Sequence, residues 1–152
     1  MQTEISGAAP GTAPRTAYVP VLPFMVCDAA GHYALHGVRC RACGAVIAGE
    51  RLACPACGAR DSFDRIELST AGTVRAHTVV HRSFPGVKTP FVAVVVDLDG
   101  GGAVRGTLID VDPLGPVPAH VKMVFRDSGQ QDKQGKPFIS YMFVPSGGAP
   151  DK

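Results

Sequence analysis

Four cysteines in the first half of the chain have the spacing of a metal site. They form two pairs in the pattern C-x2-C-x10-C-x2-C, and they are Cys40, Cys43, Cys54 and Cys57. Each pair stands in a near-repeat, because the Cys-Arg-Ala-Cys-Gly-Ala of residues 40–45 returns as Cys-Pro-Ala-Cys-Gly-Ala at residues 54–59. Four thiolates placed in this way can enclose one tetrahedral ion with metal–sulfur bonds of about 2.3 Å. The glycine that follows each pair can adopt the backbone conformation that turns amide N–H groups toward the sulfurs.

The four sulfurs predict a structural metal ion, and zinc is the expected one. When protein sulfur takes all four positions, none is left for water or substrate, so such an ion stabilises a fold and does not catalyse. Iron accepts the same ligands, and the sequence does not separate the two metals, although the colour of the protein would. Four buried thiols that only pack are the simpler alternative, which the doubled motif disfavours. The fifth cysteine, Cys27, lies outside the motif and is predicted to be an ordinary buried thiol.

Charge and composition argue against a protein dedicated to nucleic acid or to a membrane. The chain has 152 residues and a formal net charge of +2, which four thiolates around a divalent cation would cancel. No run approaches the roughly 18 consecutive apolar residues that a membrane helix needs. The first 20 residues are rich in Gly, Ala, Pro and Thr, and they lack the basic and apolar regions of a secretory signal. We therefore expect a cytoplasmic protein.

Five short β-rich runs follow the cysteine motif. They are Thr73–His81, Phe91–Leu98, Ala103–Ile109, Val121–Arg126 and Phe138–Val144. Their spacing is typical of a small all-β barrel or sandwich. Alternation with a period of two predicts that four residues of the first run share one face, namely Val74, Ala76, Thr78 and Val80. The second run is apolar on both faces from Phe91 to Val96, and Asp99–Gly102 is predicted to join it to the third as a hairpin.

These patterns divide the chain into four segments. We expect a flexible N-terminal tail over residues 1–23 and a polar C-terminal tail over residues 146–152. Between them, residues 24–68 are predicted to hold a short helix over Phe24–Leu35 followed by the cysteine motif, and residues 69–145 the β-rich module. Only about eleven residues separate the last cysteine from that module, so the two modules should pack together and not hang on a loose linker.

The connection between the first two β-rich runs displays groups that suit an anionic ligand. Residues 82–90 carry two cations and one aromatic ring, Arg82, Lys88 and Phe84, on a frame stiffened by proline and glycine. This loop is a candidate for contact with an anionic ligand or with a partner protein. A solvated connection between two strands is the plain structural alternative.

Together these segments resemble a known family of small proteins that couple a rubredoxin-like zinc ribbon to an OB-fold and that are associated with acyl-CoA enzymes of the thiolase superfamily. The resemblance covers roughly residues 24–144, and the matching text lies at residues 35–44, 54–58, 72–74, 77–86, 90–92 and 96–100. The cysteine pairs alone are shared with many ribbons, whereas their order before this five-strand text is far more specific. The resemblance implies a mainly β fold in which an N-terminal rubredoxin-like zinc ribbon packs on a five-stranded OB-fold barrel.

What the resemblance implies for function is a non-catalytic auxiliary subunit. In such hetero-oligomers a thiolase-fold partner carries the nucleophilic cysteine and makes or breaks the C–C bond, while this type of subunit packs beside it and helps to shape the coenzyme A channel. Arg82, Phe84 and Lys88 then become candidates for contact with the coenzyme A thioester. Residues 82–90 and 133–141 are most similar to the small subunits of 2-benzoylsuccinyl-CoA thiolases from anaerobic toluene degradation. Other relatives serve steroid side-chain aldolases and phloroglucinol acyltransferases, so the substrate stays open.

Two other functions are compatible with parts of the sequence. OB barrels often bind single-stranded nucleic acid with aromatic side chains on a basic groove. The near-neutral charge of the metal-bound chain, its ten aromatic residues and the lack of a basic strand face weigh against that alternative. An iron-containing ribbon that carries electrons is the third hypothesis, and a colourless protein that holds zinc would dismiss it.

Overall fold

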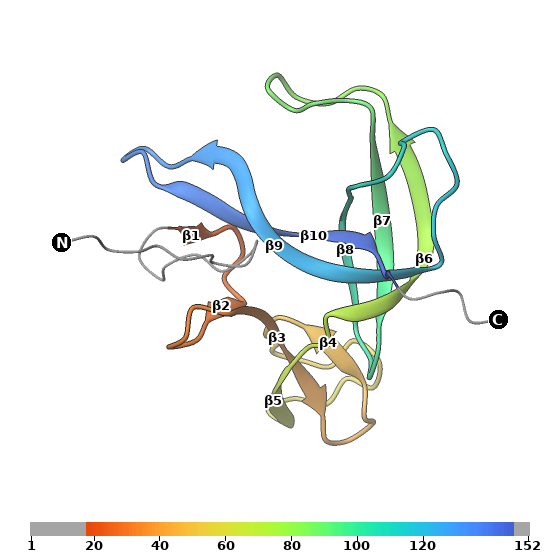
Figure 1. Ribbon diagram of the computed structural model, residues 1–152. Coiled ribbons are helices and arrows are strands. Elements are labelled where there is room, and N and C mark those ends of the chain that lie inside the picture. The colour runs from red at the N-terminus through yellow and green to blue at the C-terminus, as the bar shows by residue number, and fades with distance from the viewer. Residues whose placement is uncertain (1–17, 148–152) are drawn as a thin grey trace.

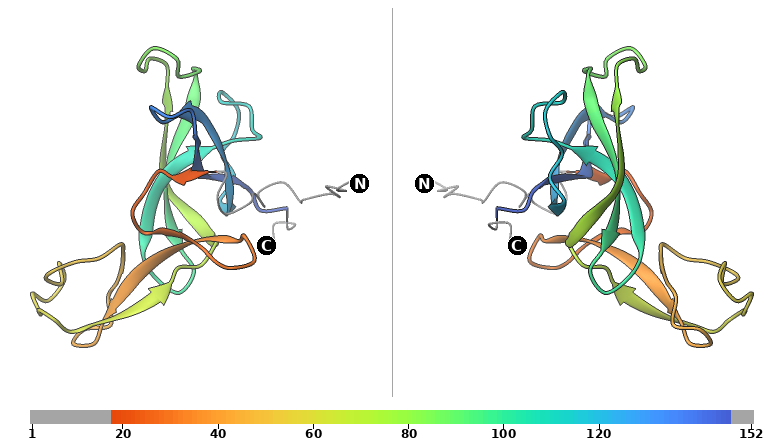
Figure 2. Two further views of the ribbon diagram at one scale, coloured as in Figure 1. Left: turned by 90° about the vertical axis from the view of Figure 1, so that its left-hand side faces the viewer. Right: turned by 90° about the vertical axis from the view of Figure 1, so that its right-hand side faces the viewer.

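The structure is a computed structural model that describes residues 18–147, and within that range every regular element is a β-strand (Figure 1). None of the described residues belongs to a helix that could cross a membrane. The strands form two sheets, a larger one that closes into a barrel and a smaller one that carries the cysteines. Figure 2 shows the smaller sheet extending from one end of the barrel.

Five strands make the barrel, and their bounds are β6 (Ala71–Val80), β7 (Phe91–Leu98), β8 (Ala103–Leu108), β9 (His120–Gln131) and β10 (Pro137–Pro145). The spatial order is β6-β7-β8-β10-β9, and β9 returns to pair with the start of β6, which closes the barrel. All neighbours are antiparallel except β8 and β10, which meet in parallel where Phe143 faces Leu108. The predicted five-stranded OB-fold barrel is therefore confirmed. A short strand β1 (Val19–Pro20) adds to the edge of β10.

Alternation along the strands fills the barrel with apolar side chains. On β7, Val92, Val94 and Val96 are at most 2% exposed, while the intervening residues are half-buried on the outer surface. The fully buried Phe143 and Ile139 of β10 close the core from the other side. The predicted hairpin at Asp99–Gly102 is also present, since Gly100, Gly101 and Gly102 all have positive φ angles.

The prediction that four residues from Val74 to Val80 share one face is wrong, because β6 contains a β-bulge. The register of β6 against β7 shifts between Val74 and Ala76, so Arg75 is an extra residue without a partner on β7. Val74 lies opposite the buried Val96 and packs against the core, whereas Ala76 lies opposite Val95 on the outer surface. A bulge moves every later side chain to the other face. Thr78 and Val80 therefore share the outer face with Ala76 and not with Val74.

The predicted helix over Phe24–Leu35 is also wrong, because this segment is a β-hairpin. Strand β2 (Met25–Cys27) pairs with the start of β3 (Tyr33–Cys40). Asp28 ends the first strand, since its carboxylate accepts the backbone N–H groups of Ala30 and His32 at 2.8 and 2.9 Å. Gly31 supplies a positive φ of 89° in the same turn. A side chain that binds the backbone locally competes with helix formation, and a residue in the left-handed region ends it.

The smaller sheet, which we call the ribbon, holds the cysteine motif against the barrel. Its other strands are β4 (Val46–Ala48) and β5 (Phe63–Glu67), which flank β3 on either side. The buried Leu35 of the ribbon belongs to the same apolar cluster as the interior of the barrel. A Cβ atom on Gly101, in the β7–β8 turn, would lie 2.9 Å from the side chain of Val46, so this turn sits directly on β4. The two modules therefore pack together, as expected, and they contribute to one apolar cluster.

The tails predicted at residues 1–23 and 146–152 lie largely outside the described residues. Within the first of them the structure begins at Tyr18, and Val19–Pro20 is a strand and not part of a free tail. At the other end, the backbone N–H of Ser146 donates to the carbonyl oxygen of His120 at 3.0 Å.

Replacing Gly106 with valine is expected to destabilise the barrel by about 1–3 kcal/mol, because it overpacks a filled core. A Cβ atom at this position would lie 2.9 Å from the ring of Phe143 and 3.2 Å from that of Tyr141. Denaturant unfolding measures the change. Gly147→Val is the matched control, since a Cβ atom there has no neighbour within 4 Å. Equal stability of the two variants would contradict the packing argument.

Candidate metal centre

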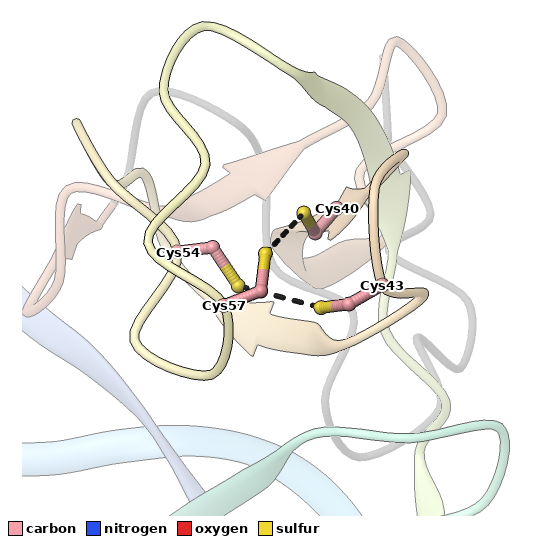
Figure 3. A group of neighbouring side chains, drawn as sticks. All are labelled: Cys40, Cys43, Cys54 and Cys57. Carbon is pink, nitrogen blue, oxygen red and sulfur yellow. Dashed lines mark hydrogen bonds between the residues drawn. The ribbon is translucent and has the colours of Figure 1, made fainter.

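The four cysteines of the motif meet at one end of the ribbon (Figure 3). Their sulfur atoms all lie within 4.8 Å of one another. The Sγ atoms of Cys40 and Cys57 are 3.8 Å apart, and those of Cys43 and Cys54 are 3.6 Å apart. A tetrahedron with metal–sulfur bonds of about 2.3 Å has edges of about 3.8 Å. The four sulfurs therefore have the separation of a tetrahedral set and can hold a metal ion.

Two turns of the same conformation present the sulfurs. In the first, the N–H of Gly44 donates to the carbonyl of Cys40, and the N–H of Cys40 donates to that of Ala45, both at 2.8 Å. In the second turn the equivalent bonds, Gly58 to Cys54 and Cys54 to Ala59, have the same length. Both glycines have a φ of +79°. The sequence repeat is thus a structural repeat, and glycine is needed because other residues rarely adopt this conformation.

Each turn places one cysteine inside and one outside. Cys40, at the end of β3, and Cys54 are 1% and 2% exposed, whereas Cys43 and Cys57 lie at the surface. Arg41, which follows the first cysteine, pairs with a carboxylate: its Nε donates to Asp64 at 3.0 Å. Backbone N–H groups of the two turns supply positive potential at the sulfurs.

Hydrogen bonds from that backbone separate the acidities of two thiols. The N–H groups of Cys57 and Ala56, with contributions from the sulfurs of Cys43 and Cys40, outweigh burial and lower the pKa of Cys54 to about 7. The N–H of Ala45 acts to lower the pKa of Cys43, but the hydrogen bonds with the other three sulfurs, together with burial, outweigh it and raise this pKa to about 12. Backbone hydrogen bonds therefore favour the thiolate form of Cys54, which is the form that binds a metal ion.

The loop predicted to contact an anionic ligand lies at the other end of the molecule. It connects β6 to β7 and projects beyond the barrel, away from the ribbon (Figures 1 and 2). Arg82, Phe84 and Lys88 are all exposed there, and the Phe84 side chain is 82% exposed. No acidic residue occurs in the sequence from residue 68 to residue 96. The structure therefore does not bring these three residues to the cysteines but gathers them on a cationic tip with an apolar end.

A shallow groove on the barrel was not predicted from the sequence. It crosses the outer surface of β6, β7 and β8 and has a volume of about 370 Å³. Small side chains form much of it: Ala76 lies opposite Val95, which pairs with Arg105 on its other side, and Ala93 lies opposite Thr78. The bulge at Arg75 creates this surface by turning Ala76 outward. The only signal in the sequence was the apolar character of β7 on both faces.

Comparisons with known proteins agree on one kind of relative. The family described as "ChsH2, C-terminal OB-fold domain" matches residues 65–126. A DUF35 domain-containing scaffold protein of Methanocaldococcus jannaschii is 32% identical over 117 residues, which cover 74% of this chain and 82% of the relative. A protein of the same description from Methanothermobacter thermautotrophicus is 28% identical over 116 residues, covering 74% and 87%.

One solved structure extends the likeness to three dimensions. The structure described as the Ltp2-ChsH2(DUF35) aldolase is similar to this chain with a TM-score of 0.57 and 25% sequence identity. The match covers 74% of this chain and 84% of that chain. The likeness therefore extends over most of both chains.

Proposed function

Because this chain belongs to the family of DUF35 domain-containing scaffold proteins, we propose that it is a non-catalytic zinc-binding subunit of a hetero-oligomer that acts on acyl-CoA C–C bonds. The partner would be a thiolase-fold subunit that carries the reactive cysteine. The observation that carries this proposal is the likeness of fold and sequence to the DUF35 chain of a two-component aldolase. Catalysis by another polypeptide also agrees with the cluster, in which protein sulfur would occupy every position of a tetrahedral ion.

The proposed ion is zinc in a structural role. Cys40, Cys43, Cys54 and Cys57 would hold it, and the sulfur separations of 3.6 and 3.8 Å support a fit to zinc–thiolate bonds. When bound, zinc would supply a crosslink between the two turns and no chemistry on substrate. Iron would fit the same sulfurs, and the absence of visible colour in the purified protein would exclude it.

The outer groove of β6, β7 and β8 supports docking against another protein. The outer face of β7 carries half-buried apolar side chains, and its inner face is apolar as well. Such an outer face is a surface that a partner would cover. Ala93 and Val95 lie in this groove, and the cationic loop 82–90 joins two of its strands, β6 and β7. A partner seated here would cover the strands that carry this loop.

The loop itself is proposed to contact the coenzyme A thioester near the interface. Arg82 and Lys88 would pair with phosphate groups, and Phe84 would pack on an apolar part of the ligand or of the partner. The exposure of all three side chains, and the lack of acidic residues from 68 to 96, support this role. The finer proposal, that the substrate is 2-benzoylsuccinyl-CoA, rests on the resemblance at residues 82–90 and 133–141. The location of the protein in the cytoplasm stays a prediction from the sequence.

Binding of single-stranded nucleic acid remains the competing function. A stacking platform needs several exposed aromatic rings. Among the large apolar side chains of residues 18–147 that are exposed, Phe84 is the one aromatic ring.

Co-expression with a thiolase-fold protein tests the main proposal, which expects the two chains to purify together. Salt-sensitive binding to oligonucleotides without association would favour the competitor.

A further inference from the structure

A second cavity lies on the ribbon, apart from the cysteines and from the loop 82–90. Its volume is about 380 Å³, which falls within the range of about 300–1,000 Å³ for small-molecule pockets. The apolar wall comes from the segment around β2, with Phe24 and Val26. The ring of Phe24 lies against the backbone of Gly49, where a Cβ atom would approach it to 3.1 Å. Because Gly49 also has a φ of +77°, it is a residue that both the turn and the pocket require.

The opposite wall of this cavity is cationic. Arg51 and Arg65 line it together with one carboxylate, that of Glu50, so the charged lining carries one net positive charge. The guanidinium of Arg51 donates to the backbone carbonyl of Glu50 at 2.9 Å. Arg65 pairs with the Glu50 side chain at the exposed rim. Exposed pairs of this kind contribute little energy, so Arg65 can turn toward a ligand at small cost.

His36 lies at the base of the same cavity. It stands on β3 opposite Glu67 of β5, and Glu67 does not line the cavity. The groups that face the interior are therefore two guanidinium groups, one carboxylate, one imidazole and apolar carbon. A monoanion balances this lining, whereas a dianionic phosphate would exceed its charge.

We propose that this pocket binds a small monocarboxylate with an apolar body. The carboxylate accepts hydrogen bonds from Arg51 and Arg65, since the planar guanidinium matches a carboxylate in two-point geometry. The apolar body lies against Phe24 and Val26. The site uses residues from the segment before β3, from the turn after β4 and from β5, which explains why no single motif in the sequence marks it.

Titration of the full-length, zinc-loaded chain with 3-phenylpropionate tests this site without any partner protein. Backbone amide shifts in NMR spectra should saturate at residues around Phe24, Gly49 and Arg65. Arg51→Gln is expected to weaken binding by about tenfold or more, because a charge-assisted hydrogen bond is lost. The neutral 3-phenylpropionamide should bind weaker by a similar factor. Val26→Phe, which narrows the pocket and leaves its charges unchanged, should also weaken binding.

Arg126→Gln is the matched control, because Arg126 is an exposed arginine of the barrel that pairs with Asp110 far from the ribbon in sequence. It should bind 3-phenylpropionate like the original chain. Equal affinity for the amide and the carboxylate would overturn the anion site. Tighter binding of inorganic phosphate, lost in Arg51→Gln, would overturn the carboxylate assignment. Shifts that do not saturate, or that arise elsewhere in the chain, would overturn the site itself. None of these results depends on association with a catalytic subunit.

Discussion

Replacing Cys40 with alanine is expected to abolish stoichiometric zinc binding and to unfold the ribbon. Structural zinc contributes about 10–16 kcal/mol in small finger domains, which exceeds what the short strands β4 and β5 can supply without it. Cys40 is 1% exposed and ends the central strand of the ribbon, so its loss removes a ligand and a buried contact together. Elemental analysis of the purified chain counts the metal. Amide hydrogen exchange over residues 40–67 reports the loss of structure.

The control for this experiment is the fifth cysteine. Cys27 lies on β2, outside the cluster, and its Sγ contacts the carbonyl oxygen of Asp28 at 3.6 Å. Cys27→Ala removes a thiol and should retain one zinc per chain and the protection of the ribbon. A Cys40→Ala chain that stays protected and still associates with the catalytic partner would contradict a structural role for the metal.

Turnover of an acyl-CoA substrate is expected only when this chain and a thiolase-fold partner are both present. The isolated chain should show no cleavage, because in the proposed complex the partner carries the nucleophile. Co-expression with and without this chain, followed by a coenzyme A-dependent cleavage assay on the purified material, measures the effect. Turnover by the homogeneous isolated chain would contradict the scaffold role. Failure of the two chains to associate would also contradict the scaffold role, because that role requires contact with the catalytic partner.

Within that complex, the loop 82–90 makes a sharper test of coenzyme A contact. Neutralising Arg82 and Lys88 with glutamine should raise KM for the thioester by about tenfold and leave kcat nearly unchanged, because contacts made equally in the ground and transition states affect binding alone. Arg126→Gln, an exposed arginine outside the loop, should change neither constant. An unchanged KM in the loop variant would contradict contact with coenzyme A. It would favour the alternative that the loop is a solvated connection between two strands.

Most of the barrel could be predicted from the sequence because its strands are rich in β-forming residues and end at strong turn signals. β7 was predicted with its observed bounds, and Asp99–Gly102 is a hairpin whose three glycines have positive φ. The cysteine cluster was equally predictable, since a C-x2-C turn imposes the same local geometry wherever it occurs. Ligand type and spacing alone were sufficient for this part of the candidate site.

The features that were missed depend on contacts between distant segments or on local hydrogen bonds. The hairpin at Met25–Tyr33 forms because Asp28 binds backbone N–H groups and because Leu35 is buried against the barrel, and neither interaction has a periodic signal. The bulge at Arg75 adds one residue to one strand, which alternation alone cannot locate. The pocket beside Arg51 draws on three separate segments, so its lining became visible only in the folded chain.

The seating of the β7–β8 turn on β4 bears on how such proteins diversify. Gly101 leaves no room for a side chain above Val46, and Leu35 of the ribbon completes the interior of the barrel. A ribbon taken from a distant homologue would therefore meet a mismatched surface, and a barrel separated from its ribbon would expose apolar side chains to water. Recombination between lineages should therefore exchange residues 24–145 as one unit. Loops remote from the contact between ribbon and barrel can vary with the binding partner.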